Sequence, residues 1–142
     1  MSRLVSSRKR LLRVRHVQHS QAVADVMRAR DEVSQLSHNA ERISRVRAEL
    51  FESAEHTNGA AFAAQRELAT RLERAGRQID GAIYDARRRV DETDARRLHA
   101  DRDREVAERL TEQAKAAREA AAEARLSAIP RYRRMQSKET DA

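Results

Sequence analysis

The chain has 142 residues, of which 37% are charged and only four, two Phe and two Tyr, are aromatic. Its 30 basic and 23 acidic residues give a formal net charge of +7 at pH 7, and it contains no cysteine. So few aromatic residues provide too little bulk for a globular core around an enclosed active site, and the lack of cysteine excludes disulfides, Cys-ligated zinc and thiol catalysis.

The first predicted element is a helix over residues 4–56, a stretch that contains neither Gly nor Pro. Its apolar residues recur with helical periodicity, which argues against disorder of the whole chain, the competing interpretation of so charged a composition. The a and d positions of the heptad repeat form the seam, the stripe expected to pack against a partner helix. This seam is most apolar from Val26 to Leu50 and weak before Ala22. The expected core positions are Val5, Leu12, His19, Val26, Val33, Ala40, Arg47 and Ala54 at a, and Arg8, Arg15, Ala22, Ala29, Leu36, Ile43 and Leu50 at d.

A break is predicted at residues 57–60, where the sequence reads Thr57-Asn58-Gly59. Asn and Gly adopt the left-handed conformation more readily than other residues, and Gly is the usual residue after the end of a helix. We therefore expect Asn58 and Gly59 to stop the first helix and to turn the chain back on itself.

A second helix is predicted over 61–129, before Pro130, with a tail over 130–142. The apolar stripe of this helix departs from the heptad register at Ile83 and Val90, because each of them follows a d position by one residue. The expected positions are Leu72, Ile79, Ala86, Thr93, Ala100, Ala107, Ala114 and Ala121 at a, and Leu68, Ala75, Ala82, Arg89, Arg96, Asp103, Leu110, Ala117 and Ala124 at d. The sequence thus predicts an all-α fold over 1–142, two long helices forming an antiparallel coiled-coil hairpin about 80 Å long, at about 1.5 Å per residue.

The positive charge is concentrated at the chain ends. Residues 1–24 contain six basic and no acidic residues, and residues 130–142 contain four basic and two acidic residues, so 20 bases and 21 acids remain elsewhere. The hairpin would bring the two basic ends together. Such a surface either keeps the helix soluble or receives an acidic partner.

The architecture, the segment from Arg10 to His19 (RLLRVRHVQH) and the apolar ladder at Leu68, Leu72, Ala75 and Ile79 resemble the FliJ family of flagellar export chaperones. Two departures from that family are the few aromatic residues near the turn and the polar insertions Arg89, Arg96 and Asp103. The resemblance implies a stalk and chaperone of the flagellar type III protein export apparatus, without enzymatic activity, cofactor or small-molecule substrate.

The same resemblance implies two partner contacts. Arg8, Arg10, Arg13 and Arg15 would face the pore of the hexameric export ATPase, and Leu68, Leu72, Ala75 and Ile79 would contact the cytoplasmic domain of the membrane export gate. The four ladder residues also coincide with a and d positions, so an intramolecular core is the alternative use. Export chaperones are a further implied partner. The implied location is cytoplasmic, peripheral to the inner membrane at the flagellar base, which agrees with the absence of a membrane-length apolar run or a signal-peptide segment.

Other functions find less support in the residues. No phosphate-binding loop or nucleophile triad is legible, and the pair His16 and His19 lacks a nearby acidic ligand in the sequence, so neither catalysis nor metal binding is expected. The alternatives that stay open are nucleic-acid or anionic-membrane binding through the basic N-terminal segment, a structural oligomer, and a stalk protein of an injectisome. No aromatic residue is available there for base stacking, which disfavours nucleic acid.

Overall fold

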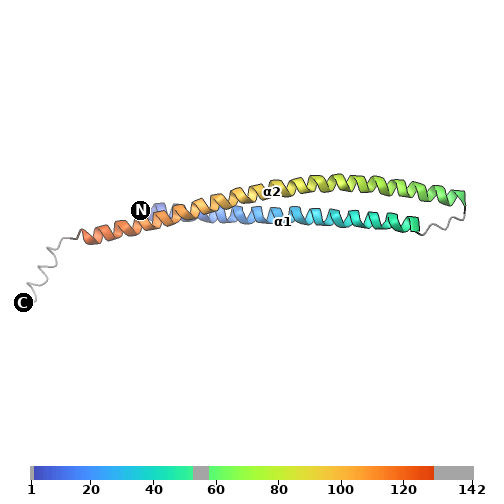
Figure 1. Cartoon of the computed structure of the whole chain (residues 1–142). Coiled ribbons are helices and arrows are strands. Elements are labelled where there is room, and N and C mark those ends of the chain that lie inside the picture. Colours follow the sequence, from blue (N-terminus) through green and yellow to red (C-terminus); the bar gives the residue numbers. More distant parts are fainter. Residues whose placement is uncertain (1, 53–57, 130–142) are drawn as a thin grey trace, which may run out of the picture. The chain divides into compact units, whose positions relative to one another are not determined.

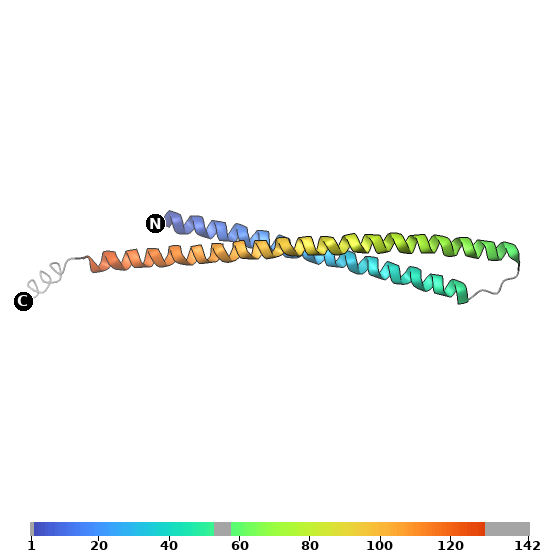
Figure 2. The ribbon, with the colours of Figure 1, turned by 45° about the horizontal axis from the view of Figure 1, so that its top comes forward.

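The computed structural model describes residues 2–52 and 58–129, which form two long helices (Figure 1). Helix α1 spans Ser2–Glu52 and helix α2 spans Gly59–Ser127. The helices pack side by side in opposite directions in both ribbon views (Figures 1 and 2), and no strand occurs within the described residues. The all-α helical hairpin predicted from the sequence is confirmed.

The predicted helix boundaries are close to the observed ones. α1 begins at Ser2 instead of residue 4, and its predicted end at residue 56 falls within 53–57, outside the described residues. α2 begins at Gly59 instead of residue 61 and ends at Ser127, two residues before the predicted end. The predicted tail over 130–142 also lies outside the described residues.

The Asn58-Gly59 pair begins a helix, so the prediction that it ends one in a left-handed conformation is wrong. No described residue, glycine included, has a positive φ angle. The Asn58 side-chain oxygen Oδ1 accepts a hydrogen bond of 2.7 Å from the amide of Ala61, and its carbonyl accepts one of 3.2 Å from the amide of Phe62. Asn58 is therefore the N-cap of α2, and its side chain satisfies an amide that has no partner within the helix.

The chain divides into two compact units. The terminal unit consists of residues 1–19 and 99–142, and the central unit consists of residues 20–98. Each unit pairs a stretch of α1 with a stretch of α2. The most buried apolar residues of the central unit are Val26, Ala29 and Ala86, whereas those of the terminal unit are Val5, Ala107 and Ala114, so both cores are thin.

The heptad register predicted for α1 is confirmed by burial. Every predicted core position from Val5 to Leu50 is buried or half-buried, with the single exception of Arg47, which is exposed. The positions include Arg8, Arg15 and His19 in the terminal unit, where charged or polar side chains occupy the seam. Local apolar periodicity was sufficient to locate this face because α1 keeps one repeat along its whole described length.

The register predicted for α2 is only half right. Its a positions are buried or half-buried, but five d positions are exposed: Leu68, Arg89, Arg96, Ala117 and Ala124. From Leu68 to Leu110, the residue after each d position is half-buried or buried, namely Ala69, Gly76, Ile83, Val90, Arg97, Arg104 and Thr111, whereas Arg118 and Arg125, which follow Ala117 and Ala124, are exposed. A Cβ added at Gly76 would lie 3.9 Å from Cγ2 of Ile43, so this glycine faces α1. The apparent drift at Ile83 and Val90 thus marks the true seam.

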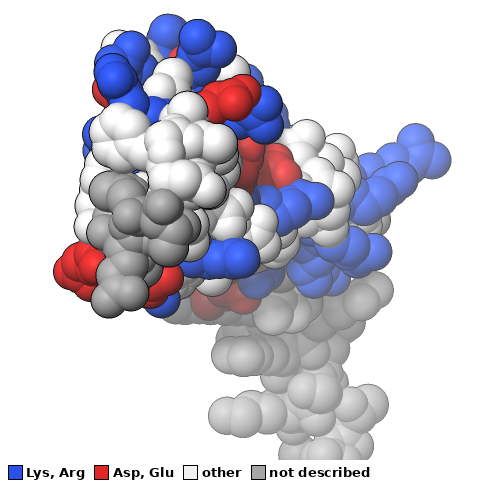
Figure 3. Space-filling model, turned by 90° about the vertical axis from the view of Figure 1, so that its right-hand side faces the viewer, with Lys and Arg blue, Asp and Glu red and all other residues white. Residues whose placement is uncertain are grey.

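The start of α2 is uncharged: residues 58–65 contain no charged side chain. In Figure 3, which looks onto this end, uncharged residues drawn in white lie near the viewer and Lys, Arg, Asp and Glu lie around them. Phe51 and Phe62 are exposed here, at 59% and 46%.

Neither described helix contains a stretch that is both long and apolar enough to cross a bilayer.

Candidate functional site

The basic residues near the N-terminus fall into two groups on α1. Arg8 and Arg15 are half-buried in the seam of the terminal unit, whereas Arg10 and Arg13 are exposed, as are Arg3 and Lys9. The four residues that the resemblance assigns to the ATPase contact therefore do not share one face. Only Arg10 and Arg13 of that set are fully available to a partner.

Arg15 is already engaged inside the hairpin. Its guanidinium Nη1 lies 3.3 Å from the carboxylate Oδ2 of Asp103 on α2 and donates a hydrogen bond of 3.0 Å to Oε1 of Gln18 on its own helix. Both members of the ion pair are about one third exposed. Arg15 and Asp103, which looked like seam defects in the sequence, are partners in an interhelical contact.

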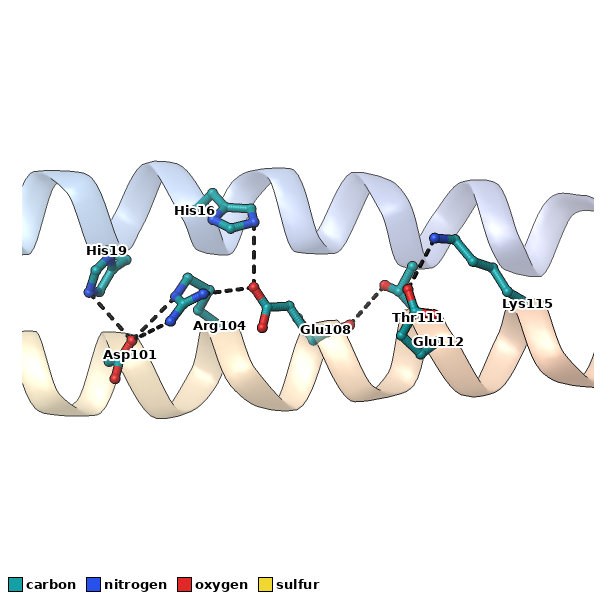
Figure 4. Close-up of polar contacts among 9 residues, drawn as sticks. His16, His19, Asp101, Arg104, Glu108, Thr111, Glu112 and Lys115 are labelled. Carbon is teal, nitrogen blue, oxygen red and sulfur yellow. Dashed lines mark hydrogen bonds and ion pairs between the residues drawn. The ribbon is translucent and has the colours of Figure 1, made fainter.

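Two histidines of α1 face the same stretch of α2 (Figure 4). Nε2 of His16 lies 3.8 Å from Oε1 of Glu108, and Nε2 of His19 lies 3.5 Å from Oδ1 of Asp101. Arg104 lies between the two carboxylates: its guanidinium donates to Oδ1 of Asp101 at 2.8 and 3.2 Å and to Oε1 of Glu108 at 2.7 Å. Two imidazoles and one guanidinium therefore share two carboxylate groups.

The pKa of the Arg104 guanidinium is raised above its ordinary value, first by its hydrogen bonds to Asp101 and then by the negative charges of Glu108 and Asp101, with partial desolvation acting in the opposite direction. Arg104 is consequently a cation throughout the physiological pH range. Its charge holds both carboxylates in place along α2.

The cations of the first turns of α1 lie in a stretch of the chain that contains no acidic residue. Within residues 2–52 and 58–129, no carboxylate lies within ion-pair distance of Arg3, Arg8, Lys9, Arg10 or Arg13. Further along the chain, Arg71, Arg77 and Arg97 each pair with an acidic residue three or four positions earlier on α2, and Arg89 pairs with Glu32 across the hairpin at 2.6 Å. Other arginines of the described residues, such as Arg66 and Arg74, are unpaired too, but acidic residues are interspersed among them, whereas residues 1–24 contain none. The unpaired cations thus form a positive surface that the hairpin itself does not neutralise.

The predicted gate-contact ladder lies in the central unit and is split between seam and surface. Leu68 is 45% exposed, whereas Leu72, Ala75 and Ile79 are half-buried. Leu72 and Ile79 face α1, so the intramolecular use weighed in the sequence applies to them. Leu68 is outside the seam and remains accessible.

An apolar groove runs along one side of this seam. It has a volume of about 290 Å³ and is lined by Asn39, Arg42, Ile43, Val46, Leu72 and Ile79. Val46 is 47% exposed at its edge. The groove on the other side of Ile43, about 520 Å³, is lined largely by charged residues, including Glu41, Arg47, Glu73, Arg77 and Asp80. The apolar and the charged groove give the hairpin two chemically different sides at this level.

No described group of three or more His, Asp or Glu side chains has the arrangement needed to hold a metal ion. In the sequence, His16 and His19 stood out only as a pair at i, i+3. Their acidic neighbours come from residues more than 80 positions away, so a local scan could not find them. The signal available was the antiparallel register: Arg15 and His19 occupy core positions, which places them opposite the charged stretch of α2.

The comparisons with known proteins leave the chain without an assigned family: it matches no protein-family model, no curated protein and no solved structure. The resemblance to the FliJ family stays a prediction based on architecture, the Arg10 to His19 segment and the ladder.

Proposed function

We propose that this chain is a stalk-like component and chaperone of the flagellar type III protein export apparatus, which links the hexameric export ATPase to the membrane export gate. The observation that carries the proposal is the unpaired positive surface formed by Arg3, Lys9, Arg10 and Arg13 on a helical hairpin. A two-helix stalk that binds inside a ring needs charged side chains that have no ion-pair partner within the stalk itself, and these residues supply them.

The proposed ATPase contact consists of the exposed cations and excludes Arg15. Asp103 already neutralises Arg15, and breaking that pair to bind a partner would offset part of the gain. Arg10 and Arg13 have no such competitor among the described residues. An acidic ring surface would therefore be attracted mainly by the outward cations, and the attraction would weaken as salt is added.

The proposed gate contact is the apolar groove with its exposed edge. Val46, which lines the groove, and Leu68, one helical turn before the lining residue Leu72 on α2, offer apolar surface that the hairpin does not bury. An amphipathic helix or an apolar loop from the gate would bury this surface, which is the usual way in which apolar grooves recognise partners.

The ATPase contact is tested by the double reversal Arg10→Glu and Arg13→Glu. The affinity for the purified export ATPase is measured by calorimetry at low and at physiological salt. It should fall at least about ten-fold, because the reversal replaces attraction by repulsion. The matched control is Arg66→Glu with Arg74→Glu, which makes the same change in net charge at two exposed positions of the central unit. The control should bind as the unmodified protein does.

Equal losses in the two double variants would show that net charge alone, and no defined surface, governs the interaction. Nucleic-acid binding is the competing function that the unpaired cations also favour. It predicts tight binding to DNA or RNA that survives physiological salt and no association with the ATPase, and this pair of results would overturn the stalk assignment.

The gate contact is tested by Val46→Glu with Leu68→Glu. Both side chains are about half exposed, so the helices should stay folded by circular dichroism while binding to the cytoplasmic domain of the gate falls about ten-fold through the loss of apolar burial. Leu98→Glu, a change of the same kind at an exposed leucine of the same unit, should leave gate binding intact. Undiminished binding in the double variant would remove the groove from the proposal.

A further inference from the structure

We infer that one side of the terminal unit docks onto an anionic membrane surface, with both of its helical stretches lying in the plane of the lipid headgroups. The inference does not depend on the proposed export function. It follows from an apolar face that the two helices share, from the arginines along its outer edges, and from the distance between those edges. This docking face consists of Leu4, Leu11, Val14, Val106 and Leu110.

The ion pair between Arg15 and Asp103 marks the side of the seam on which the docking face lies. Nη1 of Arg15 on α1 lies 3.3 Å from Oδ2 of Asp103 on α2. Residues three, four or seven positions apart lie on the same side of a helix. Leu11 is four positions before Arg15 on α1, and Val106 and Leu110 are three and seven positions after the aspartate on α2. The pairing of the helices therefore places these three apolar side chains on one side of the terminal unit.

The hairpin leaves the docking face open to solvent. Leu4, Val14 and Val106 are 48%, 52% and 52% exposed, and Leu11 and Leu110 are half-buried. The opposite side of the seam is different, because it carries the charged cluster of Arg104 with Asp101 and Glu108. The terminal unit is thus apolar on one side and charged on the other, which is the pattern of helices that lie in a membrane interface.

Exposed arginines border the docking face along both outer edges. They are Arg3 and Arg10 on α1, and Arg102 and Arg109 on α2. Arg10 lies one turn before Val14, and both arginines of α2 lie one turn from Val106. Within the described residues, no carboxylate lies within ion-pair distance of any of the four, and the exposed Glu105 lies further around α2, away from the face. Both edges are therefore positively charged, as attraction to anionic headgroups requires.

The separation of the two edges favours a flat partner over a single docked helix. Helices that pack side by side have axes about 8 to 10 Å apart, and the helical repeat places Arg10 and Arg109 on the sides of their helices that face away from the seam. A helix laid on the face is about 10 to 12 Å wide, so it would not reach both edges, whereas a bilayer surface meets both. The arginine stems can lie along apolar surface while their guanidiniums reach the lipid phosphates. Nucleic acid would meet the cations but leave the aliphatic side chains without a partner, since the face has no aromatic residue for base stacking.

The test is flotation of the full-length protein with lipid vesicles at physiological salt. The partition coefficient should be at least about ten-fold higher on vesicles of phosphatidylglycerol and phosphatidylcholine, in a ratio of about 3:7, than on vesicles of phosphatidylcholine alone. Arg102→Gln with Arg109→Gln should lower the coefficient on the anionic vesicles about ten-fold, because two cations near the surface are lost. The matched control is Arg66→Gln with Arg74→Gln, the same change in net charge at exposed positions of the central unit, which should leave the coefficient nearly unchanged.

The apolar part of the docking face is tested by Val14→Gln with Val106→Gln. Both valines are about half exposed, so circular dichroism should show intact helices, while partitioning onto the anionic vesicles falls about five-fold or more through the loss of apolar burial. Val23→Gln with Met27→Gln changes two exposed apolar residues of α1 in the central unit and should retain binding. Unchanged partitioning in the Val14 and Val106 variant would show that charge alone attracts the protein, and it would overturn the inference.

The orientation on the membrane is tested with a polarity-sensitive fluorophore. The chain contains no cysteine, so the fluorophore can be attached at a single introduced one. On anionic vesicles its emission should move to shorter wavelength from Val106→Cys, on the docking face, and should stay constant from His16→Cys, on the opposite side of the seam. Equal partitioning onto neutral and anionic vesicles, or an emission shift from position 16 and none from position 106, would contradict the inference.

Discussion

Asn58 shows how one side chain can decide where a helix begins. Its Oδ1 accepts from the Ala61 amide, the third residue of α2, and no other described side chain takes this role at the start of that helix. The sequence signal was ambiguous because Asn followed by Gly is equally suited to a helix end and to a helix start. The distinction depends on where the flanking apolar faces meet, which no short motif records.

Replacing Asn58 by Ala should therefore destabilise the protein by about 1 kcal/mol, since one amide of the first turn loses its partner. Urea unfolding measures this change. Asn58→Ser and Asn58→Asp supply another oxygen acceptor and should retain most of the stability. If Ala and Ser at this position were equally stable, the cap would have no energetic role.

The charged and polar residues in the seam of the terminal unit likewise have partners that the local sequence does not reveal. Arg15 and His19 looked like defects in an apolar pattern, yet both, like the neighbouring His16, lie within 4 Å of a carboxylate on α2. Sequence reasoning found their positions but not their partners, because the pairing is set by the register between helices and not by local spacing.

The two helices differ in how well their faces could be predicted. α1 carries Val, Leu and Ile at most seam positions of the central unit, so its periodicity identified the buried face. In α2, Thr111 is buried and Gly76, Arg97 and Arg104 are half-buried, although these residue types are typical of a surface, while the apolar Leu68 is exposed. Long Arg side chains can lie along a seam with their charged ends in water, so burial of the stem does not require an apolar residue.

The corrected register of α2 predicts a specific order of mutational effects. Ile83→Ala should cost about 1 to 2 kcal/mol, because a half-buried side chain in the seam is lost, whereas Leu68→Ala should stay within about 0.5 kcal/mol. Both changes introduce Ala into the same helix, so their helix-propensity terms differ only by the small difference between Leu and Ile, which works against the expected order. Urea unfolding of the two variants decides between the registers, and a larger loss at Leu68 would restore the d assignment expected from the sequence.

At the scale of the whole molecule, the net charge of +7 is carried almost entirely by the ends of the chain. The basic end of α1 was predictable from composition alone. What could not be predicted was its division into cations used by the hairpin, such as Arg15, and cations left unpaired, such as Arg10 and Arg13. That division turns a general basic segment into a defined candidate surface and changes which residues an acidic partner would contact.

In the proposed function, the outward cations and not the whole basic segment meet the export ATPase. Replacing Arg10, Arg13 or Arg15 singly by a photo-reactive amino acid and irradiating the protein with the purified ATPase tests this most directly. We expect cross-links to the ATPase from positions 10 and 13, and cross-links to α2 of the same chain from position 15. Cross-links to the ATPase from position 15 alone, or from none of the three, would contradict it.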